Sequence, residues 1–309
     1  MKPWKHTKKV AIVYDRVNKW GGAERVLLAL HEIFPDAPLY TSVYDSKKAS
    51  WAKVFPAVKT SFLQKIPLVK SLHELFGWLM PVAFESFNFD KFDLVISVTS
   101  EAAKGIKTKP DTLHICYCLT PTRYLWSLND YYFKNPPVYF KIFPFFRVIS
   151  KPNRLVPYKK VDLAVSAFNQ LGLPLIVVGT GSERVKLKRS AKENIKFVGE
   201  VSETKLAKYY QNAKALIMPQ EEDFGIVAVE AQSYGVPVIA YKKGGSLDTV
   251  IDGKTGILFD KQNPKTLIRA VRKFEKMKFD KKRLTENARK FSKARFKKEF
   301  LDLTKKMLN

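Results

Sequence analysis

Two acidic residues, Glu222 and Glu230, bracket a mostly apolar run in the stretch EEDFGIVAVE. Asp223, Phe224 and Gly225 look like a turn that opens a helix, and eight residues along a helix make a little over two turns. Both carboxylates can therefore point at one ligand. A capping acid followed by an unrelated surface acid would give the same spacing, so the pair alone does not decide between the two interpretations.

Two basic residues could supply the complementary chemistry for an anion. The stretch NRLVPYKKVD sets Arg154 and Lys159 five residues apart, just before an expected helix. Together they could neutralise a diphosphate, because Arg offers a planar fork of donors and Lys offers a point charge. In a chain this basic, a chance pair fits equally well, so these residues need support from neighbouring motifs.

Glycine turns lie between expected strands and helices in both halves of the chain. The stretch GTGSERVKL carries Gly179 and Gly181, and WGGAERV carries Gly21 and Gly22. The stretch at 241–250, YKKGGSLDTV, repeats the pattern. Such a turn can aim the free amides of the next helix at a phosphate. Each turn alone is weak support, since many glycine turns are only turns.

The elements that would position these residues alternate along the chain. KKVAIVYD, FDLVISV and LHICYCL are typical of buried parallel strands, and AERVLLALHEIF has helical spacing. The second half alternates the strands LPLIVVG, IKFVG, ALIMP and VPVIAY with single helices, one capped by Ser202 and one ended by Gly235. This alternation predicts doubly wound α/β domains, which bind ligands at the carboxyl ends of their strands.

Composition narrows the classes of partner. The 309 residues suggest two domains, and the net charge of +26 predicts attraction to polyanions. No RNP-like strand, zinc finger or basic recognition helix occurs, so specific nucleic-acid binding is not expected. The only cysteines, Cys116 and Cys118, are predicted to be small core residues in a strand, and no metal site is predicted.

Two aromatic and basic segments bear on membranes. Residues 62–87 and 131–149 mix Phe, Leu, Trp and Tyr with Lys, a composition that suits peripheral contact with an anionic bilayer. Core helices with snorkelling lysines would look the same. The N-terminus lacks the pattern of a signal peptide and no apolar stretch is long enough to span a bilayer, so a cytoplasmic protein is expected.

In order, the motifs resemble the nucleotide-sugar-binding half of glycosyltransferase family 4. They run R-L-x-x-x-K, V-G-x-G-x-E-R, F-V-G, E-D-F-G-I-V-x-V-E-A-x-x-x-G-x-P-V-I-A, G-G and D-G-x-T-G-I-L-F. The chain looks most like the mannosyltransferase-like branch that builds surface polysaccharides. The resemblance covers nearly all of residues 147–260, and it continues through WGGAERV (20–26) and HICYCLTPTRYLW (114–126).

This resemblance implies a GT-B fold of two Rossmann-like domains facing across a cleft. We expect an acceptor-side domain at 1–145, incomplete relative to the family, and a nucleotide-sugar-binding domain at 146–309 that includes the basic C-terminal helices. A nucleotide sugar, with a GDP-sugar favoured over a UDP-sugar, would be the donor. No cofactor or metal would be needed, since the leaving diphosphate would be held by basic residues.

The resemblance also implies a role for each matched residue. The catalytic residues would be Arg154 and Lys159, which hold the diphosphate, and Glu222, which holds hydroxyls of the transferred sugar. Glu230 would accept hydrogen bonds from the ribose. The remaining donor-binding positions would be Gly21, Gly22, Gly179, Gly181, Phe224, Gly225 and Ile226, with the base near residues 197–201.

The chain departs from the family pattern at two places. Leu119 stands where the family usually has a His that contacts the donor sugar, and leucine can neither hydrogen-bond nor carry charge. The segment around 134–150 is several dozen residues shorter than in the family, which would leave an exposed edge on the first sheet. A gene deletion, a natural compact variant and an artificial join all remain open as origins.

We therefore expect a retaining, metal-independent hexosyltransferase, with mannose as the favoured sugar and a lipid-linked or polysaccharide acceptor. The alternative is a catalytically impaired homologue that binds a nucleotide sugar without efficient transfer. Leu119 and the short first domain favour that alternative.

Overall fold

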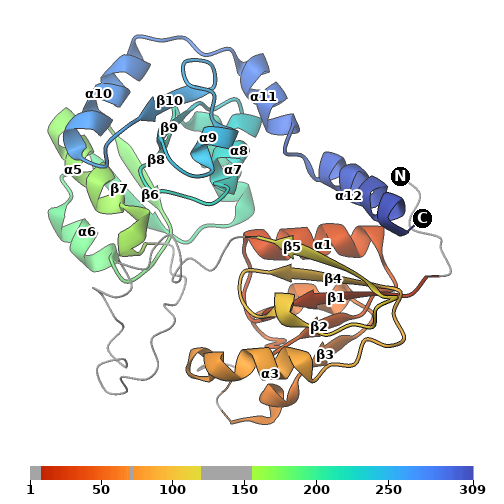
Figure 1. Cartoon of the computed structure of the whole chain (residues 1–309). Coiled ribbons are helices and arrows are strands. Elements are labelled where there is room, and N and C mark those ends of the chain that lie inside the picture. Colours follow the sequence, from red (N-terminus) through yellow and green to blue (C-terminus); the bar gives the residue numbers. More distant parts are fainter. Residues whose placement is uncertain (1–7, 68, 70–72, 120–154, 309) are drawn as a thin grey trace. The chain divides into compact units, whose positions relative to one another are not determined.

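In this computed structural model, residues 8–67, 69, 73–119 and 155–308 are described. The chain divides into two compact units (Figure 1). Unit 1 comprises Met1–Ser150 together with Phe296–Asn309, and unit 2 comprises Lys151–Arg295. Arg154 and the 131–149 segment lie outside the described residues.

Unit 1 contains a five-stranded parallel sheet in the order β3-β2-β1-β4-β5. The strands are β1 (Val10–Tyr14), β2 (Leu39–Thr41), β3 (Val58–Thr60), β4 (Leu94–Thr99) and β5 (Leu113–Cys118). Every residue of β1 and β4 is buried, which explains their continuous apolar runs in the middle of the sheet. Strand β5 is the last strand of this sheet in the described part of the chain.

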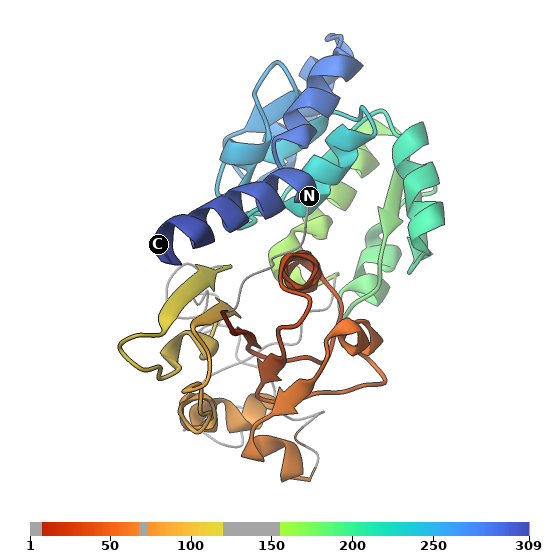
Figure 2. The ribbon, with the colours of Figure 1, turned by 90° about the vertical axis from the view of Figure 1, so that its right-hand side faces the viewer.

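Helices cover both faces of that sheet (Figure 2). Helix α1 (Gly22–Ile33) packs Leu27 and Leu30 into the core on one face, and α3 (Met80–Glu85) packs Phe84 into a separate core on the other. Short 3-10 turns complete the unit. They are η1 (Ser50–Val54), η2 (Phe62–Lys65), η3 (His73–Leu79) and η4 (Ala103–Gly105).

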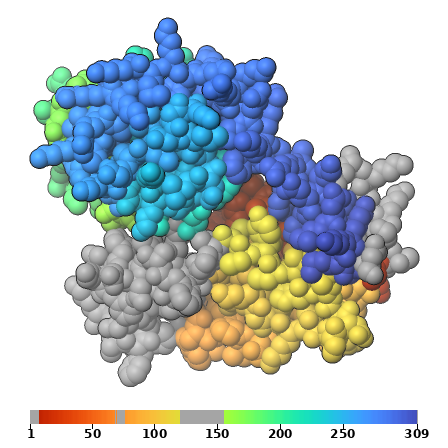
Figure 3. Space-filling view, turned by 45° about the horizontal axis from the view of Figure 1, so that its top comes forward, coloured from red at the N-terminus to blue at the C-terminus, as the bar shows by residue number. Residues whose placement is uncertain are grey.

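The C-terminal helix α12 (Lys293–Leu308) differs from the sequence prediction, which placed it in the second domain. Its residues from Phe296 onward belong to unit 1 (Figure 3). Phe300 packs edge-on against Phe34, Phe296 packs against Tyr117, and Lys297 pairs with Glu32 at 2.8 Å. The apolar stripe of this basic helix is therefore buried on unit 1, a partner that helical periodicity does not identify.

Unit 2 contains two parallel sheets, β10-β9-β8 and β6-β7, among the described residues. The strands are β6 (Leu175–Val178), β7 (Ile195–Gly199), β8 (Leu216–Met218), β9 (Val238–Tyr241) and β10 (Gly256–Phe259). Two helical elements precede these strands, η6 (Pro157–Lys159) and α5 (Val161–Leu171). Between and after the strands lie α6 (Arg184–Ser190), α7 (Glu203–Asn212), α8 (Ile226–Ser233), α9 (Ser246–Thr249), α10 (Pro264–Glu275) and α11 (Lys281–Arg289).

Local signals set several of these helix ends. Ser202 caps α7 by accepting the amide of Lys205, as the sequence predicts. Asn263 caps α10 by accepting the amide of Thr266, and Pro264 occupies the first helical position, where no amide donor is needed. The chain leaves α8 through Gly235, which has the positive φ of +73° expected after a helix end.

The two cysteines correct a sequence prediction. Cys116 and Cys118 do lie on β5, but both are exposed rather than buried in the core. On this strand Ile115 and Tyr117 pack against the core that includes α1. Because side chains alternate along a strand, the cysteines face away from that core.

Candidate functional site

In unit 2, a loop that carries Glu221, Glu222 and Asp223 follows strand β8, and it is called the acidic loop below. Lys159, at the end of η6, forms an ion pair with Oε1 of Glu222, and both side chains keep part of their surface exposed at 24% and 16%. Gln220 Nε2 donates to the same carboxylate oxygen at 3.0 Å. The structure thus brings together two of the residues that the sequence singled out, although they stand 63 positions apart.

Helix α8 begins immediately after this loop. Its N-cap, Gly225, adopts the left-handed conformation with φ +74°, which explains the glycine, and no side chain caps the helix. The amides of Phe224, Gly225 and Ile226 have no acceptor among the described residues. They form a set of unpaired donors beside Glu222, at the positive end of a helix dipole.

The glycine pair after β9 fixes the shape of the acidic loop. The amide of Gly245 donates to the carbonyl of Glu222 at 2.7 Å, and Gly244 pairs with Glu222 as an isolated bridge. A Cβ on Gly244 would lie 2.3 Å from that carbonyl oxygen, and one on Gly245 would lie 2.5 Å from the carbonyl oxygen of Asp223. These glycines are needed because the two backbones touch.

Glu230 lies inside α8 and has a different environment from Glu222. The Tyr210 hydroxyl donates to Glu230 Oε2 at a long 3.4 Å. Tyr210 also stacks on Tyr234, with ring centroids 5.5 Å apart. Glu230 is half-buried, and its carboxylate lies beside this pair of aromatic rings.

The GTG turn packs closely against the backbone at Leu155. A Cβ on Gly181 would lie 2.5 Å from the carbonyl oxygen of Leu155, so this glycine permits close backbone contact. The amide of Glu183 donates to that carbonyl at 3.0 Å, and the amide of Arg184 donates to Gly181 at 3.1 Å. Two amides at the start of α6 are thus occupied within the chain, which limits what this turn can offer a phosphate.

In unit 1 the glycine pair opens α1, with Gly21 as the N-cap and Gly22 as the first helical residue. The N-cap Gly21 is extended, and a Cβ there would lie 3.1 Å from Oε2 of Glu24. A Cβ on Gly22 would meet no atom within 4 Å. Glu24 is itself buried and accepts a hydrogen bond from the Tyr14 hydroxyl at 2.7 Å. Burial, reinforced by this carboxylate, raises the pKa of Tyr14.

Asp15 is a residue that the sequence analysis missed. It directly follows the buried strand β1, and its carboxylate is buried beneath the loop that follows β4. That carboxylate accepts five hydrogen bonds of 2.8–3.1 Å, from Thr99 Oγ1 and from the amides of Ser100, Glu101, Ala102 and Ala103. The acid directly after KKVAIVY was the available signal, but its partners lie more than 80 residues away.

Beside this network, Arg16 forms an ion pair with Glu101. Burial raises the pKa of the Glu101 carboxyl, while the Arg16 charge opposes the rise. Nη1 of Arg16 is enclosed and has no hydrogen-bond partner among the described residues. The charged groups at the carboxyl edge of the first sheet thus find their hydrogen-bond and ion-pair partners within unit 1.

Leu119 extends the β4–β5 pairing, because its amide donates to the carbonyl of Thr99 at 2.9 Å. Its side chain is half-buried and packs against the core of unit 1. The leucine therefore has a packing role in this chain at the position where the resembled family carries an imidazole.

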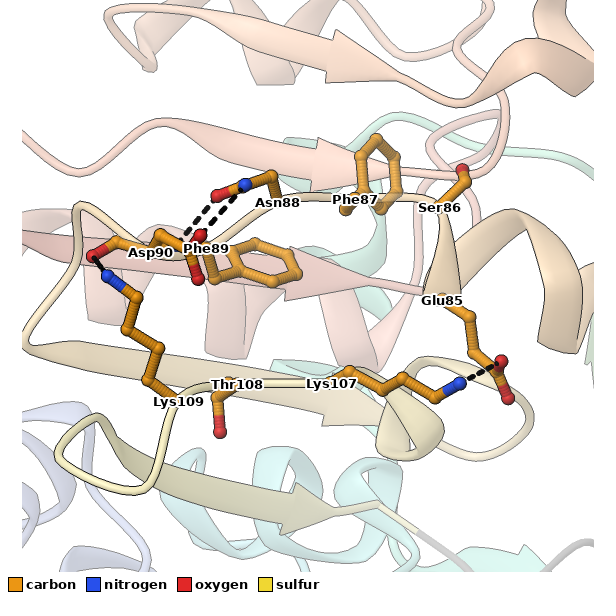
Figure 4. Close-up of a pocket in the computed structure, with 9 residues that line it drawn as sticks. All are labelled: Glu85, Ser86, Phe87, Asn88, Phe89, Asp90, Lys107, Thr108 and Lys109. Carbon is orange, nitrogen blue, oxygen red and sulfur yellow. Dashed lines mark hydrogen bonds and ion pairs between the residues drawn. The ribbon is translucent and has the colours of Figure 1, made fainter.

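The described surface also has a shallow hollow of about 370 Å³, shown in Figure 4. It lies in the loops before β4 and β5, at the opposite edge of the sheet from the strand ends discussed above. Lys107 pairs with Glu85 at 2.6 Å, and Asn88 binds Asp90 at 3.0 Å. Because these charged groups already have partners, the hollow offers little chemistry for a ligand.

Residues 145–291 match the family model described as glycosyl transferases group 1. A sucrose-phosphate synthase from Thermosynechococcus elongatus aligns with a TM-score of 0.66 at 17% identity, over 97% of this chain and 99% of its own. The apo lipopolysaccharide outer core galactosyltransferase WaaB aligns with a TM-score of 0.62 at 16% identity, over 97% of this chain and 100% of its own. The fold is GT-B.

Curated relatives match shorter segments. An uncharacterised glycosyltransferase from Methanocaldococcus jannaschii is 33% identical over 117 residues, which are 36% of this chain and 33% of the relative. A GDP-mannose-dependent alpha-(1-6)-phosphatidylinositol monomannoside mannosyltransferase from Mycolicibacterium smegmatis is 32% identical over 38% of this chain and 36% of its own length. This chain thus spans about a third of either relative.

These similarities confirm the GT-B fold predicted from the sequence and support a place in the glycosyltransferase superfamily. Assignment to family 4 and to its mannosyltransferase branch stays a prediction. Within the described residues, no helix is both long and apolar enough to cross a bilayer. Nor do three His, Cys, Asp or Glu side chains in that part of the chain gather as metal ligands would.

Proposed function

We propose that this protein transfers a hexose from a nucleotide sugar to a lipid-linked or polysaccharide acceptor, with retention of configuration and without a metal. The observation that carries the proposal is the Lys159–Glu222 pair beside the unpaired amides that open α8. A cation, a carboxylate and free helix amides match the diphosphate and the hydroxyl groups of such a donor.

In this proposal Lys159 holds the diphosphate, and Arg154 assists it on the strength of the sequence resemblance. The bond between the sugar C1 and the phosphate oxygen breaks, and negative charge grows on the leaving nucleoside diphosphate. Lys159 and the amides of Gly225 and Ile226 stabilise that charge more in the transition state than in the ground state. The ion pair with Glu222 keeps the lysine in place before the donor arrives.

The two glutamates divide the hydroxyl groups between them. Glu222 accepts hydrogen bonds from the transferred sugar. Glu230, which lies about one turn into α8, accepts them from the ribose. The acceptor hydroxyl forms the new bond to C1 on the face that the phosphate leaves, and its proton passes to the departing phosphate oxygen. Positioning is therefore the main contribution of the protein.

A binding titration tests this proposal. GDP, UDP, ADP and their common sugar conjugates are titrated into the purified protein, into Glu230→Ala and into Glu286→Ala, an exposed glutamate on α11 that serves as a control. We expect saturable binding of one nucleotide, weakened by about 1–3 kcal/mol in Glu230→Ala only, as for lost hydrogen bonds to a charged group. Absence of binding by every nucleotide would overturn the proposal.

A second candidate function is binding of the nucleotide sugar without efficient transfer. The half-buried, apolar Leu119 favours it, because this side chain supplies no proton or hydrogen bond. Release of nucleoside diphosphate in the presence of an acceptor separates an enzyme from a binding protein. Leu119→His should raise that rate if the missing imidazole is the cause, and Leu119→Asn, which also disturbs the packing, controls for stability.

Membrane contact is part of the proposal and has its own test. Phe62, Trp78 and Val82 are 41%, 63% and 55% exposed in a unit of a chain with net charge +26. Such side chains suit insertion at an anionic lipid interface. We expect co-sedimentation with anionic vesicles, lost in Trp78→Ser and absent with neutral vesicles. A cytoplasmic location, on the inner face of a membrane, stays a prediction.

A further inference from the structure

The identity of the donor base is open, because the relatives point in different directions. One carries GDP-mannose in its name, whereas the Anabaena protein HepE, with a TM-score of 0.59 and 15% identity, was crystallised with UDP and glucose. A residue that reads the base should lie in unit 2 and should have hydrogen-bonding capacity that the folded chain leaves unused.

Arg184 meets this description. Two arginines in the described part of the chain have an enclosed nitrogen without a hydrogen-bond partner, Arg16 and Arg184. Arg16 still pairs with Glu101, whereas Arg184 makes no side-chain hydrogen bond or ion pair with any described residue. Its Nε is enclosed, and its two terminal nitrogens reach solvent. An enclosed, charged donor without a partner is unfavourable unless a ligand completes it.

The position of Arg184 is well defined by the backbone. It is the first residue of α6, and its amide is held by Gly181 at 3.1 Å, while the preceding amide is held by Leu155. A Cβ on Gly199 would lie 4.0 Å from Nη2 of Arg184, so the guanidinium stands beside the last residue of β7. This is the carboxyl end of the β6-β7 sheet, the edge at which doubly wound domains bind ligands.

We propose that Arg184 reads the donor base and selects one that presents carbonyl acceptors, guanine or uracil, over adenine. The inference rests on the proposed function, in which the base lies near residues 197–201. A guanidinium can only donate hydrogen bonds. Guanine offers O6 and N7 to both terminal nitrogens at once and uracil offers O4, whereas adenine places an amino donor next to N7 and opposes the arginine.

Nucleotide titrations test this assignment. GDP, inosine diphosphate, UDP and ADP are titrated into the wild type, Arg184→Ala, Arg184→Lys and Arg189→Ala, the last an exposed arginine on the same helix. We expect the wild type to bind GDP or UDP about 10- to 100-fold more tightly than ADP. Arg184→Ala should remove at least about tenfold of that preference and leave ADP unchanged, and Arg184→Lys should retain part of it.

The controls separate the ways in which the idea can fail. Inosine diphosphate keeps O6 and N7 and should respond to Arg184→Ala as GDP does, and Arg189→Ala should bind every nucleotide as the wild type does. Equal weakening of GDP, UDP and ADP would assign Arg184 to the shared ribose and phosphates and overturn base reading. An unchanged preference in a folded Arg184→Ala variant, checked by circular dichroism, would also overturn it. Failure of the wild type to bind any nucleotide would reject the proposed function itself.

Discussion

Asp15 and Glu222 both follow a strand at the carboxyl edge of a parallel sheet, yet their surroundings differ. Asp15 is buried and accepts five hydrogen bonds from one loop of its own unit. Glu222 is partly exposed and forms an ion pair with Lys159, which is also partly exposed. It lies beside the amides at the start of α8, which have no acceptor among the described residues. The hydrogen-bonding capacity of Asp15 is therefore filled by its own unit, whereas Glu222 remains accessible to a ligand.

The difference shows that position at a strand end does not by itself identify a ligand site. A polar group binds a ligand only if the folded chain leaves some of its hydrogen-bonding capacity unused. The same distinction separates the start of α8, with its free amides, from the start of α6, where Leu155 and Gly181 occupy two of them.

The largest effect should follow from removing Asp15. Asp15→Ala leaves four buried or half-buried amides without their acceptor, so we expect a loss of about 3–5 kcal/mol in the free energy of unfolding of unit 1. All five tryptophans precede residue 150, so tryptophan fluorescence in a urea titration reports on this unit alone. Asp45→Ala is the control, because the Asp45 carboxylate accepts exposed amides and pairs with the exposed side chain of Lys48. A loss below about 1 kcal/mol would refute the structural role of Asp15.

A smaller effect should distinguish the two glycine pairs. Gly244→Ala combines a φ of +63° with a Cβ placed 2.3 Å from the carbonyl oxygen of Glu222, so we expect about 2–4 kcal/mol of destabilisation of unit 2. Gly22→Ala meets no atom within 4 Å and should stabilise α1 by a few tenths of a kcal/mol. Far-ultraviolet circular dichroism during urea unfolding measures both, and similar costs for the two variants would contradict the comparison.

Replacing the cation of the Glu222 site should affect binding more than folding. Lys159→Ala should weaken the binding of the nucleoside diphosphate by about 1.5–3 kcal/mol, because the charge-assisted hydrogen bond from Lys159 to the diphosphate is lost. Its effect on unfolding should stay within about 1 kcal/mol, since the ion pair is partly exposed. Isothermal titration calorimetry measures the first quantity and urea unfolding the second. Lys243→Ala, which removes a more exposed pair with Glu221, provides the matched control.

The smallest effect concerns pH and the carboxyl edge of unit 1. Burial raises the pKa of Glu101 above its ordinary 4.5. The negative charge of Asp15 also raises this pKa, and the positive charge of Arg16 lowers it. The folded chain then holds this proton more tightly than the unfolded chain, so the contribution of Glu101 to stability falls as the pH rises from 4.5 through the raised pKa.

Glu101→Gln removes this titration, and its unfolding free energy should therefore improve relative to the wild type as the pH rises through that window. Tryptophan fluorescence in urea between about pH 4.5 and 7 measures the difference. A difference between the two proteins that stays constant with pH would show that Glu101 has an ordinary pKa.

Sequence patterns predicted much of the fold from local information. Continuous apolar runs identified β1 and β4, Ser202 identified the start of α7, and the order of motifs indicated GT-B. The roles proposed for Glu230 and for Arg154 remain predictions, the latter because it lies outside the described residues. The patterns failed for Cys116, because membership of a strand does not say which face of the sheet is covered.

By itself, the sequence determined the long buried strands, several helix starts and the glycines and acids at their ends, because periodicity and backbone preference act over a few residues. It did not mark the short strands β2, β3 and β10. Only the tertiary structure decided what each polar group and each apolar face contacts. It paired Lys159 with Glu222 across 63 positions, closed the loop after β4 over Asp15, and packed the C-terminal helix on unit 1. Those partners are set by long-range packing, which a local pattern does not contain.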